Sequence, residues 1–211
     1  MQEISYWRND GWLAVKDMNA VFIHIPKTAG LMIQEVLKLD VLRYPHRAKK
    51  FKNKGLVTFG HLNYPKLVKR QIVRRDFDRT AFKFAFCRNP YDRAVSHYFY
   101  VQKKHPDILS KGMSFLDFTS TLKDYGHKFE PQSWWVKDVK LDFLGKFENL
   151  NSDLTEIAYR LGINLGKLPK INTTEHGPFQ EYYCQESKEN IAKYYQVDFE
   201  RFGYDHNLLH R

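Results

Sequence analysis

The chain has 211 residues, of which 43% are hydrophobic and 16% aromatic, so it can bury a sizeable core. No apolar run approaches the length of a membrane-spanning helix, and the two cysteines, Cys87 and Cys184, are too few for a disulfide framework. The formal net charge of +10 indicates an anionic partner. Because no repeat, low-complexity tract or Gly/Ser-rich linker divides the chain, we expect a single domain over residues 1–211.

The first expected strand, over residues 20–25, leads into a short Pro-Lys-Thr-Ala-Gly turn at 26–30. A helical pattern over 31–39 follows at once. A strand, a tight loop and a helix start together favour an anion, because the first N–H groups of a helix are unpaired and carry partial positive charge. Lys27 adds a full positive charge and Thr28 adds a hydroxyl. The segment therefore predicts a site for a phosphate or a sulfate.

This loop differs from the common nucleotide-binding loop. The Walker pattern places its lysine after the second of two glycines and follows it with Ser or Thr, whereas Lys27 precedes the only glycine of the loop, Gly30. The loop therefore gives little support to an ATPase. An ordinary strand-to-helix turn with a surface lysine is the simpler alternative.

The next expected elements are a strand over 56–60 and a helix over 64–75. His61 stands just beyond the end of this strand, and a histidine with a pKa near ~6.5 can accept a proton near neutral pH. A packed or solvated histidine is the alternative, because the chain holds nine histidines. His24 lies inside the first strand, and we expect it to be structural.

A strand is expected over 80–87, because phenylalanines alternate there with smaller or polar residues. Pro90 suits the first turn of a helix expected over 90–103. Arg88 stands at the end of the strand and Ser96 about two turns into the helix, so a guanidinium and a hydroxyl can converge on one phosphate. A capped helix with a surface Arg and Ser is the alternative.

A strand over 141–147, a helix over 150–161 and a last helix over about 187–201 complete the pattern, and Gly203 is a good left-handed terminator. Alternating strands and helices imply an α/β fold, with a parallel sheet covered by helices on both faces. Ligands of such sheets bind beyond the carboxyl ends of the strands. The lysine loop, the histidine and the arginine all follow strand ends, so one crevice would hold all three.

Two of these motifs resemble those of a known family. Pro-Lys-Thr-Ala-Gly after an Ile/His strand resembles the 5′-phosphosulfate loop of the sulfotransferases that use 3′-phosphoadenosine 5′-phosphosulfate (PAPS), above all the carbohydrate branch. Arg-Asn-Pro-Tyr-Asp-Arg-x-x-Ser at 88–96 is very similar to their 3′-phosphate motif. Phe59-Gly60-His61-Leu62 resembles the Gly-His element of the uronyl 2-O-sulfotransferases. Further similar segments extend the resemblance over about residues 20–205: 132–135, 145–150, 171–174 and 198–204.

The resemblance implies a P-loop-like three-layer α/β sandwich with a central parallel sheet, PAPS as sulfuryl donor, 3′-phosphoadenosine 5′-phosphate (PAP) as product, and no metal. Lys27 would neutralise the leaving phosphate, and His61 would be the base that deprotonates the acceptor hydroxyl. The implied donor-binding residues are Lys27, Thr28, Ala29, Gly30, Leu31, Met32, Arg88, Ser96, Asn172 and Thr173.

The chain departs from the family directly after the loop glycine. The family usually continues with Thr or Ser, whereas this chain has Leu31 and Met32. The backbone N–H groups survive this change. Two hydroxyl hydrogen bonds to a charged group, each worth about 1.5–3 kcal/mol, would be missing from the donor site.

The excess positive charge lies in one stretch around His61. From Val41 to Arg75 there are eleven Lys or Arg residues and no Asp or Glu. A solvated basic face is one explanation. The alternative is a basic rim that concentrates an anionic polysaccharide near the site. We therefore expect an anionic carbohydrate acceptor, bound by Lys49, Lys50, Lys52, Lys66 and Arg70.

Two other functions fit the same features. A non-enzymatic protein could bind a polyanion, either glycan or nucleic acid, on the same fold, and a P-loop kinase is the other alternative. We expect a sulfotransferase with no nucleic-acid partner and no membrane segment. Residues 1–5 lack the basic start and apolar core of a secretory signal, so we expect a cytoplasmic enzyme of bacterial or viral type, or a Golgi-lumenal one if an anchor was removed.

Overall fold

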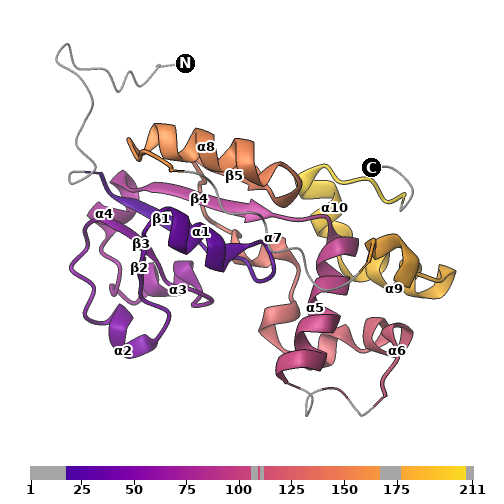
Figure 1. Cartoon of the computed structure of the whole chain (residues 1–211). Helices are drawn as coiled ribbons and strands as arrows, with labels where there is room; N and C mark the ends of the chain where they lie inside the picture. The colour runs from indigo at the N-terminus through magenta and orange to yellow at the C-terminus, as the bar shows by residue number, and fades with distance from the viewer. Residues whose placement is uncertain (1–17, 106–108, 110–111, 167–176, 208–211) are drawn as a thin grey trace.

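The computed structural model describes residues 18–105, 109, 112–166 and 177–207. At its centre is a five-stranded sheet in the order β2-β3-β1-β4-β5, and every neighbouring pair is parallel (Figure 1). The strands are β1 Ala20–Ile23, β2 Asp40–Val41, β3 Leu56–Thr58, β4 Phe82–Cys87 and β5 Phe143–Lys146. The α/β fold expected from the sequence is confirmed.

Helices follow the strands and cover the sheet. They are α1 Gly30–Val36, α2 Pro45–Ala48, α3 Tyr64–Lys69, α4 Arg75–Thr80, α5 Pro90–Lys104, α6 Phe115–Ser120, α7 Gln132–Trp135, α8 Leu150–Arg160, α9 Gln185–Tyr194 and α10 Gln196–Phe202. Short 3₁₀ helices occur at Leu122–Tyr125, His127–Phe129, Phe147–Asn149 and Phe179–Tyr182. No helix in this described part of the chain is long and apolar enough to cross a bilayer.

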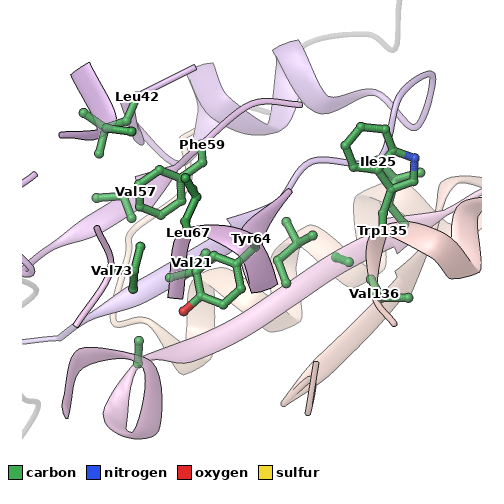
Figure 2. Close-up of a cluster of buried hydrophobic side chains, with 14 of the residues drawn as sticks. Val21, Ile25, Leu42, Val57, Phe59, Tyr64, Leu67, Val73, Trp135 and Val136 are labelled. Atoms are coloured by element: carbon green, nitrogen blue, oxygen red, sulfur yellow. The ribbon is translucent and has the colours of Figure 1, made fainter. Parts of the chain in front are cut away.

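Two apolar layers enclose the sheet. On one face, α2, α3, α4, α7 and α10 pack against side chains such as Val21 and Val57, and Figure 2 shows this cluster with Trp135 beside Ile25. On the other face, α1 and α8 pack against the phenylalanines of β1 and β4. The alternation expected along β4 is confirmed, because Phe84 and Phe86 face α1 and α8 while Ala85 and Cys87 face the opposite layer.

A third apolar cluster joins α5, α6, α9 and α10. In Figure 1, α5, α6 and α9 lie together at one end of the molecule, away from α2, α3 and α4. The amino end of α5 follows β4, so this helical cluster stands next to the carboxyl ends of the strands. This cluster forms one wall of the candidate site.

Two expected helices are each divided in the structure. The helix expected over 64–75 is α3 followed by α4, because Gln71 between them has a left-handed backbone (φ 57°) that an α-helix cannot contain. The last expected helix is α9 followed by α10, which meet at the buried Tyr195. Gly203 ends α10 with φ 64°, as expected.

Candidate active site

Three residues singled out in the sequence follow adjacent strands. β1 lies between β3 and β4, and Lys27, His61 and Arg88 come just after the carboxyl ends of these three strands. The loops touch one another: Nδ1 of His61 lies 3.2 Å from the carbonyl oxygen of His24, and Nη1 of Arg88 donates to the carbonyl oxygen of Lys27 over 3.2 Å. The sheet order therefore brings the three loops to one crevice.

The loop after β1 has an unusual backbone. Lys27 and Ala29 both have left-handed conformations (φ 70° and 61°), which cost a residue with a Cβ roughly 1–2 kcal/mol each. The hydroxyl of Thr28 is buried and donates to the carbonyl oxygen of Ile25 over 2.9 Å, so it stabilises the loop instead of pointing out of it. No side chain caps the helix that follows, so the first N–H groups of α1 have no partner in the described structure.

Gly30 is required where α1 begins. A Cβ at this position would lie 1.8 Å from Nε2 of His24. The imidazole of His24 is held there by the side-chain amide of Gln34, which lies 2.9 Å from Nδ1. Because an amide nitrogen can only donate, Nδ1 accepts and His24 is neutral, in agreement with burial, which lowers its pKa well below the usual value. The expected structural role of His24 agrees with these contacts.

The ammonium of Lys27 faces an aromatic ring. Its Nζ lies 4.2 Å from the centroid of Tyr100, and Lys27 forms no ion pair with a carboxylate among the described residues. Burial lowers its pKa to about 8, and the positive charge of Arg88 contributes to this shift. Lys27 is therefore a cation at neutral pH, and it holds its proton less tightly than an exposed lysine.

His61 has one ring nitrogen available for chemistry. Because a carbonyl oxygen can only accept, the contact with His24 places the proton of His61 on Nδ1 and leaves a lone pair on Nε2. The ring packs against His24 and Trp135, with centroids 4.3 and 5.8 Å away. Burial lowers its pKa to about 4, the backbone hydrogen bond opposes this shift, and nearby positive charges add to it. His61 is therefore a neutral hydrogen-bond acceptor at neutral pH.

Arg88 is held by partners inside the protein. Its Nε and Nη2 donate to the two carboxylate oxygens of Asp92, each over 2.8 Å, and its guanidinium carbon lies 4.0 Å from the ring centroid of Phe147. With the bond to the Lys27 carbonyl, three of its five N–H groups are used. Arg88 therefore fixes the loop against α5, and two N–H groups remain for a ligand.

Ser96 has a buried hydroxyl without a partner. Its Oγ, Nε2 of His97 and Nε1 of Trp135 are the buried side-chain nitrogen and oxygen atoms that lack a hydrogen bond within the described residues. Such atoms are rare in folded proteins and call for a specific explanation. Ser96 and His97 lie on α5, and Trp135 packs on His61. All three are in the elements that wall the crevice.

Two residues that organise this crevice had no role predicted from the sequence. Arg93 is fully buried and donates to the carbonyl oxygens of Pro26, Lys128 and Glu130, so it ties the lysine loop to the segment before α7. Tyr100 comes four residues after Ser96 on α5 and therefore shares its face of the helix. This helical spacing was the signal that could have identified Tyr100.

The expected acceptor residues lie on the surface beside β2 and on α3. Lys50 and Lys52 line a hollow of about 330 Å³ beside the edge strand β2, and Lys49 is exposed next to them. Lys66 and Arg70 are exposed at the end of α3. The expected donor residues Asn172 and Thr173 lie outside the described residues. Leu31 is 70% exposed, and Met32 packs against the apolar layer of α1 and α8.

Comparisons with known proteins agree with the α/β fold. The structure is similar to mouse sulfotransferase SULT7A1 complexed with PAP, with a TM-score of 0.57 and 16% identity over 88% of this chain and 84% of that chain. It is also similar to a sulfotransferase from Alicyclobacillus acidocaldarius, with a TM-score of 0.50 and 14% identity over 92% of this chain and 98% of that chain. The comparison with curated proteins gave no match. A family model described as "Sulfotransferase family" matches residues 12–205, and the chain therefore belongs to the sulfotransferase family.

Proposed function

We propose that this protein transfers a sulfuryl group from PAPS to a hydroxyl of an anionic carbohydrate. The observation that carries this proposal is the contact between the loops of Lys27 and His61 at the carboxyl ends of β1 and β3. The same edge of the sheet holds the uncapped start of α1 and the Nε2 atom of His61, which is left to accept a proton. Such an arrangement can stabilise negative charge and accept a proton at the same place. PAPS would supply the sulfuryl group when bound.

The donor residues present in the structure fit a ligand with two anionic ends. Lys27 and the first N–H groups of α1 would hold the 5′ end, and the two remaining N–H groups of Arg88 would hold the 3′-phosphate. The buried, unpaired hydroxyl of Ser96 gains a partner if it binds the same phosphate. The carboxylate of Asp92 does not oppose this, because Arg88 neutralises it.

Lys27 would act on the leaving side of the reaction. Sulfuryl transfer resembles phosphoryl transfer, in which negative charge builds on the leaving oxygen. A buried ammonium without a carboxylate partner stabilises such a charge more than a paired or exposed one does. Its pKa of about 8 also permits Lys27 to share its proton with that oxygen.

His61 would act on the attacking side. Its Nε2 would accept the proton of the acceptor hydroxyl, while the hydrogen bond from Nδ1 to the carbonyl of His24 keeps the ring in one tautomer. In the protein without ligands its pKa is about 4, so the imidazole is unprotonated and ready to accept. An anionic acceptor next to the ring would raise this pKa and stabilise the imidazolium that forms.

The positive charge around His61 supports an anionic carbohydrate as the acceptor. The excess of positive charge falls in the stretch from Val41 to Arg75, which contains His61. Binding of an anionic polymer to this stretch would be weakened by salt, because exposed charges are screened over about 10 Å at 0.1 M ionic strength and ~3 Å at 1 M.

Isothermal titration calorimetry with PAP separates this proposal from its alternatives. We expect one PAP per chain, with an affinity that ATP does not match. A protein that only binds polyanions would show no stoichiometric, adenine-dependent heat, and a kinase would prefer ATP. Mass spectrometry of a glycan panel after incubation with PAPS would then identify the acceptor by the added sulfuryl mass.

A further inference from the structure

The segment between β2 and β3 begins beside the catalytic histidine. The N–H of Leu42 donates to the carbonyl oxygen of Thr58 over 2.8 Å, at the carboxyl end of β3. Arg43 then packs against Gly60, where an added Cβ would lie 2.6 Å from Cβ of Arg43. Gly60 precedes His61 in the chain. Arg43 therefore stands next to the loop that carries the proposed base.

The same segment ends at the opposite end of the sheet. The N–H of Gly55 donates to Oδ1 of Asn19 over 2.7 Å, and the carbonyl oxygen of Gly55 accepts from the N–H of Ala20 over 3.1 Å, at the amino end of β1. Lys54 immediately precedes this point. At about 3.3 Å per residue, the stretch from Lys54 to Gly60 spans at most about 20 Å along β3, the strand next to the edge strand β2.

Basic side chains gather beside the segment between β2 and β3. The hollow of about 330 Å³ beside β2 is lined by four basic residues and one acidic residue, together with Leu42 and Phe51. The basic residues are Arg47, Lys50, Lys52 and Lys54, and the acidic residue is Asp40. None of the four cations forms an ion pair within the described residues. They are exposed and available for an anionic partner.

Aromatic residues beside these basic residues already have partners within the protein. Tyr44 is 48% exposed, but the guanidinium of Arg43 lies 5.4 Å from its ring centroid and the ring of His46 stacks on it at 5.7 Å. Phe51 packs edge-on against Phe59 and Phe77. Proteins that bind single-stranded nucleic acid combine basic grooves with free aromatic faces on which bases stack. The exposed ring beside these basic residues, Tyr44, already contacts Arg43 and His46, which favours a polyanionic sugar chain over a nucleic acid.

We infer that Arg43, Arg47, Lys50, Lys52 and Lys54 form an extended track for the acceptor, which we name the edge track. An anionic polysaccharide with one sugar at His61 would run along β2 and place its further anionic groups on these side chains. This inference rests on the proposed function and adds a requirement for length: short fragments reach only His61, whereas long chains also occupy the edge track. The enzyme would therefore prefer polymers to disaccharides.

The test uses fragments of one uronate-containing polysaccharide, separated by size from the disaccharide upward. At saturating PAPS, we expect the KM of the acceptor to fall with fragment length and then to level off, while kcat changes little. Fluorescence anisotropy of the end-labelled fragments without PAPS should show the same dependence of Kd on length.

Two double variants that each remove two positive charges show where on the surface the effect arises. Lys50→Gln with Lys52→Gln should raise the KM and Kd of long fragments about fivefold and leave the disaccharide unchanged, because exposed charge pairs contribute fractions of a kcal/mol each. Lys188→Gln with Lys193→Gln on α9, which lies at the far end of the molecule from α2 in Figure 1, removes the same charge and should change neither value more than twofold.

The outcomes separate the edge track from the proposed function. Equal KM values for all fragment lengths, with active enzyme, would overturn the edge track and leave the function standing. If no fragment is sulfated, the function fails and the anisotropy series still decides the track: length-dependent binding that the Lys50/Lys52 variant loses supports it, and unchanged binding overturns it. Tighter binding of a single-stranded DNA of equal charge would also overturn it.

Discussion

The ammonium of Lys27 lies over the ring of Tyr100, with Nζ 4.2 Å from the ring centroid. The lysine comes from the loop after β1 and the tyrosine from the third turn of α5, so this contact joins the lysine loop to the helix that carries Ser96. A cation over an aromatic face is stabilised by roughly 0.5–1 kcal/mol at a partly exposed site. Tyr100 is therefore a positioning residue for Lys27.

Replacing Tyr100 should reduce the rate without unfolding the protein. We expect Tyr100→Leu to lower kcat/KM for PAPS about twofold to fivefold, because Lys27 loses the contact that orients it. Tyr100→Phe keeps the aromatic face and should stay within twofold of the wild type. Steady-state kinetics of both variants gives the answer, and a Phe variant as impaired as the Leu variant would show that the hydroxyl, not the ring, matters.

Arg88 and Asp92 permit a test that separates donor binding from stability. Arg88→Ala should weaken PAP binding about tenfold to a hundredfold, because a charge-assisted hydrogen bond contributes about 1.5–3 kcal/mol. It should also lower Tm, since Asp92 is left without its bidentate partner.

The double variant Arg88→Ala with Asp92→Ala removes that unpaired carboxylate. We expect it to regain much of the lost Tm but none of the lost affinity for PAP, as measured by differential scanning fluorimetry and calorimetry. Recovery of both quantities together would mean that Arg88 only supports the loop and does not touch the donor.

His61→Ala should abolish transfer while PAP still binds. Loss of a general base lowers kcat by about 10²–10⁴-fold. In the wild type, the pKa of His61 is lowered to about 4, so kcat/KM should fall only as the pH drops through about 4, where Nε2 becomes protonated. The pKa of Lys27 is lowered to about 8, so a second fall is expected above that pH, where the ammonium is lost.

His127 provides the matched control for this variant. Its ring also lies near Trp135, 5.9 Å between centroids, but it is exposed and comes from the segment before α7. His127→Ala should retain kcat within a few fold. If His61→Ala transferred sulfuryl groups at the normal rate, the base would have to be another residue.

A substitution of Leu31 should increase the affinity for PAP. It is 70% exposed beside the first N–H groups of α1, so a change there removes no core packing. Leu31→Thr adds a hydroxyl that can donate to the 5′-phosphate, and we expect PAP to bind about tenfold more tightly. Leu31→Val has the same branching without the hydroxyl and should show no gain. Met32 is left unchanged because it packs against the core.

The sequence could predict the sheet because its central strands are strongly patterned. β1 is buried along its whole length, and β4 alternates phenylalanines with smaller or polar residues, so both strands could be predicted from the order of residues. β2 has only two residues and α2 only four, which is too short for any periodicity to show. The position of these basic residues beside β2 is therefore visible only in the structure.

The sequence predicted which residues gather at the site better than it predicted the contacts that these residues make. Strand ends placed Lys27, His61 and Arg88 in one crevice, but their partners depend on how α5 is rotated and how loops pack. The sequence motif assigned Arg88 to a phosphate, whereas the structure joins it first to Asp92 and to the carbonyl of Lys27. The role of Arg93 could not be inferred, because its partners are backbone oxygens of distant segments.

Transfer of a labelled sulfuryl group from PAPS tests the central claim most directly. The wild type, incubated with ³⁵S-labelled PAPS and a uronate-containing polysaccharide, should place label on the polymer. Lys27→Ala should bind PAP with nearly unchanged affinity and transfer about 10²–10³-fold more slowly, because the positive charge matters most when the leaving oxygen becomes anionic. Labelled polymer formed by Lys27→Ala at the wild-type rate would contradict the role given to the loop after β1.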